Sequence, residues 1–144
     1  MDTKQYLSQI RRLDRQIQNK LSELYNLKMM ASSISVSNEG ERVQTSGNKD
    51  QLGAVVAKIV DMEKEVDKMV DLFVYTRNKI ISQIDSMDDL DSYDILSMRY
   101  VAGKTFHEIS EKTHWSIRKV FSLHGKALLE FEKKYGREYL ENVQ

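Results

Sequence analysis

A basic segment near the C-terminus, residues 116–126, carries residue types that bind nucleic acids. It reads SIRKVFSLHGK and contains Arg118, Lys119 and Lys126 but no acidic residue. On a helix, Arg118, Ser122 and Lys126 follow the spacing i, i+4, i+8 and share one exposed face. Lysine and arginine neutralise DNA phosphates, and arginine also reads guanine in the major groove. The segment is therefore a candidate DNA-binding site.

The proposed contacts extend to neighbouring residues. We expect base reading from Arg118 and Ser122. Phosphate contacts are expected from Lys119 and Lys126, and also from Lys104 or Lys112. Ile117 and Phe121 have two interpretations: they contact thymine methyl groups or a dimer partner. Gly125 has no side chain to obstruct the approach of a phosphate or a groove wall. The full candidate set is Lys104, Thr105, Lys112, Ser116, Ile117, Arg118, Lys119, Phe121, Ser122, Gly125 and Lys126.

Other chemistries have little support in the sequence. The three histidines, His107, His114 and His124, form no HExxH motif, and there is no cysteine. We find no Ser/His/Asp set, no paired-carboxylate motif and no glycine-rich nucleotide loop. We therefore expect no enzymatic activity, no metal and no cofactor.

Three helices are predicted around the basic segment. The first covers about 89–101 and ends near Gly103, which suits a left-handed position. The second begins at Thr105, which forms a capping box with Glu108, and ends near residue 112. A turn at 113–115 leads to Ser116, which caps a third helix running to about residue 135. A short helix, a turn and a longer helix together make a helix-turn-helix. We expect Tyr100 and Trp115 to lie in the core of this three-helix unit.

Two long amphipathic helices are predicted in front of this unit. Apolar residues recur every three or four positions over about 3–31 and 49–86, and the chain contains no proline. The Ser-, Asn- and Gly-rich residues of about 32–49 predict a flexible loop between them. The two helices should pair into an antiparallel, coiled-coil-like hairpin. The expected fold is all-α, with the hairpin in residues 1–86 and the helix-turn-helix unit in residues 87–144.

Charge and hydropathy limit where the protein acts. The chain has 22 basic and 22 acidic residues, so its net charge gives no argument for nucleic acid. Residues 3–30 nevertheless hold six basic and two acidic side chains. No uncharged apolar run approaches the roughly 20 residues that span a bilayer, and the N-terminus has no signal-peptide core. We expect a protein of the bacterial cytoplasm that does not bind membranes.

The C-terminal pattern resembles region 4 of sigma-70-type factors. The matching residues are LSMRY (96–100), GKTFHEI (103–109), Ser116, Lys119-Val120 and Ala127-Leu128, within about 45 of the 144 residues. The whole chain also resembles short phage and prophage proteins grouped with ArpU-like and RinA-like late transcription regulators. The resemblance implies promoter-proximal DNA binding and contact with RNA polymerase. It departs from sigma factors at Ile117 and Phe121, which are often charged there, and the core-binding region is missing.

Three functions from different classes remain open at this point. The leading one is a phage or prophage transcriptional regulator that binds double-stranded DNA and self-associates through its hairpin. The second is a DNA-packaging adaptor similar to a small terminase subunit, assembled as a ring. The third is a purely helical protein–protein interaction module.

Overall fold

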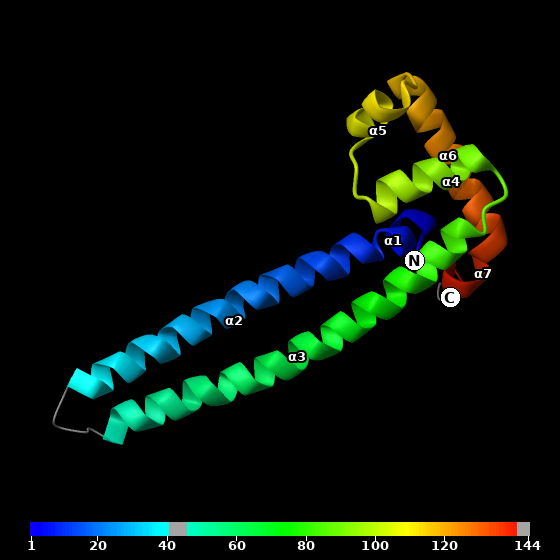
Figure 1. Ribbon diagram of the computed structural model, residues 1–144. Helices are drawn as coiled ribbons and strands as arrows, with labels where there is room; N and C mark the ends of the chain where they lie inside the picture. Colours follow the sequence, from blue (N-terminus) through cyan, green and yellow to red (C-terminus); the bar gives the residue numbers. More distant parts are fainter. Residues whose placement is uncertain (41–45, 141–144) are drawn as a thin grey trace. The chain divides into compact units, whose positions relative to one another are not determined.

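The computed structural model describes the backbone of residues 1–40 and 46–140 and the side chains of residues 1–36 and 49–140 (Figure 1). Within these ranges the protein is helical and has no strand, so the all-α prediction is confirmed. The elements are α1 (Thr3–Leu7), α2 (Gln9–Gly40), α3 (Ser46–Asp85), α4 (Leu90–Leu96), the π-helical turn η1 (Ser97–Val101), α5 (Phe106–Thr113), α6 (Ile117–Tyr135) and α7 (Arg137–Leu140).

Contacts along the chain divide it into two compact units. One contains Met1–Leu13 together with Phe73–Gln144, and the other contains Asp14–Leu72. The boundary predicted from the sequence lay after residue 86. The first unit thus also includes the start of the first long helix and the end of the second.

In the unit Asp14–Leu72, α2 and α3 run side by side in opposite directions (Figure 1). Their facing sides bury Ile17, Leu24, Val55 and Val66, all members of the predicted apolar stripes. Polar residues line the edges of this seam. Two ion pairs cross it there, Lys20 to Glu65 at 3.7 Å and Lys28 to Glu63 at 3.2 Å. Because these pairs are exposed, the apolar seam holds the helices together more strongly than they do.

The predicted loop at 32–49 is wrong over most of its length. Helix α2 continues to Gly40 and α3 already begins at Ser46; the remaining residues, 41–45, lie outside the described residues. Serine and asparagine cost only about 0.5–0.7 kcal/mol each in a helix interior. Without a proline, a well-nucleated helix extends through such residues. Ile34, half-buried, continues the apolar side of α2.

In the other unit, α6 is the central helix. Helices α1, α4, α5 and α7 all contact it. Its inward side buries Val120, Ala127 and Phe131 completely, next to Ile95 and Leu96 of α4. This arrangement leaves the opposite side of the first half of α6 exposed.

The N-terminus belongs to this unit through α1, which the sequence had merged with the first long helix. Asp2 caps α1 with a complete capping box. The Thr3 hydroxyl lies 3.0 Å from a carboxylate oxygen of Glu132 and 2.9 Å from the Tyr139 hydroxyl. Tyr6 donates a hydrogen bond of 2.7 Å to Gln83 and stacks on Tyr139 at 4.3 Å. These contacts fix the first turn of the chain against α6 and α7.

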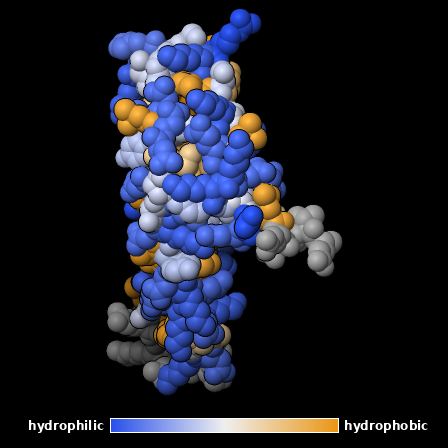
Figure 2. Space-filling model, turned by 90° about the vertical axis from the view of Figure 1, so that its right-hand side faces the viewer, coloured by the Kyte–Doolittle hydropathy of each residue, from blue (hydrophilic) through white to orange (hydrophobic). Residues whose placement is uncertain are grey.

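The surface of the molecule is mostly polar in the view of Figure 2. Hydrophilic residues predominate on that face, and hydrophobic residues appear as separate spots. Over residues 1–40 and 46–140, no helix combines the length and the apolar character needed to cross a membrane.

Candidate nucleic-acid interface

Helix α5 begins where the sequence predicted. Gly103 has φ +70°, a left-handed conformation that glycine adopts without steric cost. The chain then turns into Thr105, whose hydroxyl accepts a 3.2 Å hydrogen bond from the amide of Glu108. One of the two hydrogen bonds of the predicted capping box is therefore present, and it fixes the first turn of α5.

The turn between α5 and α6 is short, and hydrogen bonds of Ser110 and Ser116 stabilise it. His114 is left-handed, with φ 61°, and ends α5. The Ser110 hydroxyl donates a 2.6 Å hydrogen bond to the carbonyl of Trp115. Ser116 then caps α6 as predicted, because its hydroxyl accepts from the amide of Lys119 at 3.1 Å. The start of α6 is thereby fixed relative to α5 within the same unit.

The predicted contact residues gather on the exposed side of α6. Arg118, Lys119, Ser122 and Gly125 are all exposed. A Cβ atom built on Gly125 meets nothing within 4 Å, so the approach to this side of the helix is open. The segment Ser116–Lys126 has no acidic residue. This surface is cationic, open and fixed by a cap, and these are the properties that phosphate and groove contacts require.

Two aromatic contacts shape the edges of this surface. The Lys119 ammonium lies 5.3 Å from the centre of the Trp115 ring, a cation–π distance that still leaves the charge exposed. Phe121 is 53% exposed, and its ring lies 5.0 Å from that of Phe106. Ile117 is half-buried. Phe121 therefore presents apolar area beside the basic residues, while Ile117 presents less.

Lys104 and Lys112, predicted from separate elements, are brought together. The neighbouring Lys112 ammonium holds the pKa of Lys104 below its usual value, and Glu108 only partly offsets this. Two ammonium groups at close range repel each other, and an anion between them would relieve that repulsion. The pair is thus a second local concentration of positive charge, next to the Thr105 cap of α5.

Lys126 differs from the other predicted contacts. Its ammonium lies 3.7 Å from Asp89 and 3.9 Å from Glu130. Both carboxylates lie close enough to offset its charge, although the pairs are partly exposed. Of the predicted phosphate contacts, Lys126 is the one already paired within the protein. The sequence did not indicate the pairing with Asp89, which lies 37 residues earlier in the chain.

The histidines fall into two environments. His107 and His114 are exposed, whereas His124 is buried on the inner side of α6. Its Nε2 atom shares a 2.7 Å hydrogen bond with the Tyr100 hydroxyl. Burial, together with the positive charges of Lys4 and Arg99, lowers the pKa of His124 to about 4. Among the described residues, no group of three or more His, Cys, Asp or Glu side chains could hold a metal ion.

Comparisons of the chain with protein-family models, with curated proteins and with solved structures found no match.

Proposed function

We propose that the protein binds double-stranded DNA sequence-specifically, with the first half of α6 in the major groove, and regulates transcription. The observation that carries this proposal is the exposed basic side of Ser116–Lys126, with no acidic residue in that segment. Helix α5, its turn and α6 then act as a helix-turn-helix. In such motifs the N-terminal residues of the second helix contact base edges.

Each part of this surface has a distinct task in the proposal. Arg118 and Ser122 read base edges, and Lys119 contacts a phosphate. The Lys104 and Lys112 pair contacts the backbone beside α5, where the repulsion between the two ammonium groups favours an anion. Phe121 offers an apolar contact for a thymine methyl group. The proposed origin in a phage or prophage rests only on the resemblance to ArpU-like and RinA-like regulators, and the proposed contact with RNA polymerase rests only on the resemblances stated for the sequence.

The unit Asp14–Leu72 is proposed to act as a helical hairpin that joins copies of the protein. Its two helices bury one apolar side against each other but leave further large apolar side chains exposed. A second copy of the same hairpin is the partner we propose for them, because paired helices of this length assemble into larger bundles through such residues. The exposed residues are Leu21, Tyr25, Met29, Met30, Val36, Val56, Val60, Val70 and Leu72.

A binding titration with two matched variants tests the DNA proposal. Fluorescence anisotropy measures the affinity of each variant for a duplex from the upstream region of the gene. The test variant is Arg118→Ala plus Lys119→Ala, and the control variant is Lys133→Ala plus Arg137→Ala. Each variant removes one arginine and one lysine, and all four residues are exposed. We expect the first variant to weaken binding at least tenfold, since a bidentate base contact alone is worth about 1–3 kcal/mol. We expect the control to bind like the wild type. Equal affinities for both variants would refute the proposed face.

A packaging adaptor is the second candidate, favoured by the apolar residues left exposed along α2 and α3. A small terminase subunit would use the same basic side of α6 on DNA but would form a ring. A solution mass of eight or more copies would favour the adaptor over the regulator.

A further inference from the structure

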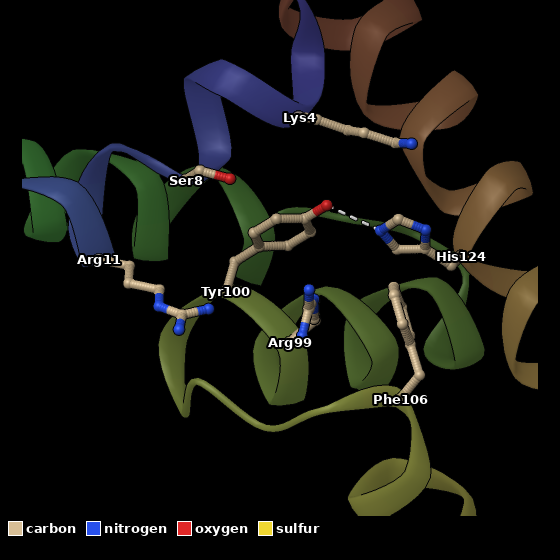
Figure 3. A pocket seen from close by; sticks show the side chains of 7 residues that line it. All are labelled: Lys4, Ser8, Arg11, Arg99, Tyr100, Phe106 and His124. Atoms are coloured by element: carbon tan, nitrogen blue, oxygen red, sulfur yellow. Dashed lines mark hydrogen bonds between the residues drawn. The ribbon is translucent and has the colours of Figure 1, made fainter.

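A cavity of about 170 Å³ lies in the unit that contains α6, away from the basic side of that helix. Lys4 of α1, Ser8 at the C-terminal end of α1 and Arg11 of α2 line it, and the remaining side chains come from η1, α5 and α6. Figure 3 shows these side chains arranged around Tyr100. Liquid water occupies about 30 Å³ per molecule, so the cavity has room for a group the size of phosphate. Its lining consists of Lys4, Ser8, Arg11, Arg99, Tyr100, Phe106 and His124.

Arg99 is held in place before any ligand arrives. Its guanidinium carbon lies 4.3 Å from the centre of the Phe106 ring, and one terminal nitrogen donates a 3.0 Å hydrogen bond to the carbonyl of Lys104. A guanidinium has five N–H donors, so most remain available. A fixed arginine loses little conformational entropy on binding a planar or tetrahedral oxyanion. The π-helical turn η1 supplies both Arg99 and Tyr100, and such turns are frequent at functional sites.

The charge of the lining is entirely positive. Three of its residues, Lys4, Arg11 and Arg99, are cationic, and no carboxylate lines the cavity. In the described part of the chain, none of the three forms an ion pair with a carboxylate. The hydroxyls of Ser8 and Tyr100 add neutral donors. Like charges that line one cavity without a counterion leave a site that favours an anion.

We propose that this cavity binds a phosphate group, with Arg99 and Arg11 as its main ligands and Lys4 as a further cation. Arginine matches the geometry of phosphate oxygens through paired N–H donors, and the hydrogen bonds are strengthened by charge. The phosphate comes from a small phosphorylated molecule or from a nucleic-acid backbone. The proposal does not depend on DNA binding by α6, because none of the lining residues is among the proposed DNA contacts.

His124 provides a built-in reporter for this site. At neutral pH its ring is uncharged, because burial and the charges of Lys4 and Arg99 keep its pKa near 4. A phosphate in the cavity would offset those charges and raise the pKa of His124. The exposed His107 and His114 do not line the cavity and serve as internal controls.

The experiment is an NMR titration of the histidine ring signals with inorganic phosphate at constant ionic strength. We expect saturable shifts of the His124 signals, a higher pKa of His124 in phosphate than in chloride, and no comparable change at His107 or His114. Unchanged His124 signals, or shifts of all three histidines alike, would overturn the proposal. A short duplex in place of phosphate identifies the source: His124 shifts with both ligands indicate a backbone phosphate, and shifts with phosphate alone indicate a small molecule.

Two matched variants locate the effect in the cavity. Lys4→Gln plus Arg11→Gln should reduce the affinity for phosphate at least tenfold, while Arg12→Gln plus Lys133→Gln should leave it unchanged. All four side chains are exposed, so the folded state should tolerate both changes. Equal phosphate affinity in both variants would contradict the assignment. The variant Arg118→Ala plus Lys119→Ala should still show the His124 shifts, which separates this site from the proposed DNA-binding face.

Discussion

Burial shifts the pKa values of Tyr100 and His124 away from their ordinary values. His124 is only 7% exposed and faces Tyr100, and their 2.7 Å hydrogen bond satisfies both groups. Burial raises the pKa of Tyr100 to about 12, so its hydroxyl stays protonated and can donate to a neutral imidazole. Charging of His124 is disfavoured in the folded state by its burial and by the positive charges of Lys4 and Arg99.

This pair predicts a pH dependence of stability. The pKa of His124 is about 4 in the folded state and near its ordinary 6.5 in the unfolded chain. The unfolded chain therefore binds the extra proton between these values, and stability falls as the pH decreases through this window. We expect the free energy of unfolding to drop by ~2 kcal/mol between about pH 7.5 and pH 5.

Urea unfolding at a series of pH values measures this drop. His124→Gln should remove most of it, because glutamine does not titrate but can still accept from Tyr100. His107→Gln, at an exposed position, should leave it intact. A drop that persists in His124→Gln would show that other groups cause it.

At the scale of single residues, the sequence predicted exposed positions better than paired ones. The helical spacing placed Arg118, Ser122 and Lys126 on one exposed face, and all three side chains are exposed in the structure. It did not predict that Lys126 pairs with Asp89, or that Lys4 and Arg11 line a cavity with Arg99. Periodicity along one helix reports which side faces water. It carries no information on which distant segment lies opposite.

Among the elements, α6 depends on its first turn for both stability and proposed function. The Ser116 cap satisfies the amide of Lys119. We expect Ser116→Ala to lower the free energy of unfolding by about 1 kcal/mol. Ser122→Ala makes the same chemical change at an exposed position inside the helix and should instead raise the free energy of unfolding by about 0.5 kcal/mol, because alanine has the higher helix propensity. Chemical denaturation of both variants tests this, and equal stabilities would show that the cap contributes little.

Element boundaries were predictable where a cap or a special backbone conformation marks them. Gly103, Thr105 and Ser116 stand where the sequence placed them. The prediction failed for residues 32–40 and 46–49, because composition is a weak signal against helix propagation. Helix α1 was predicted only as part of the first long helix, and α7 was missed. Each is five residues or fewer, and such short helices depend on tertiary contacts, here those of Thr3, Tyr6 and Tyr139.

For the whole molecule, the proposal includes self-association through the helical hairpin. The apolar residues exposed along Asp14–Leu72 predict self-association. Tyr25→Glu plus Leu72→Glu, at side chains that are 64% and 53% exposed, should lower the solution mass, because each adds a charge to the proposed interface. Light scattering of wild type and variant measures this. The same mass in both, or a monomeric wild type, would exclude this face as the interface.

DNA contact by α6 is the central claim, and the salt dependence of binding tests it most directly. The measurement is the association constant for the upstream duplex over a range of salt concentrations, for wild type, Lys119→Ala and Lys133→Ala. We predict that Lys119→Ala reduces the slope of log K against log salt by about one, since one phosphate contact is lost. Lys133→Ala, an equal charge change at the far end of α6, should keep the wild-type slope. No DNA binding at low salt, or the same slope in Lys119→Ala as in wild type, would contradict the account.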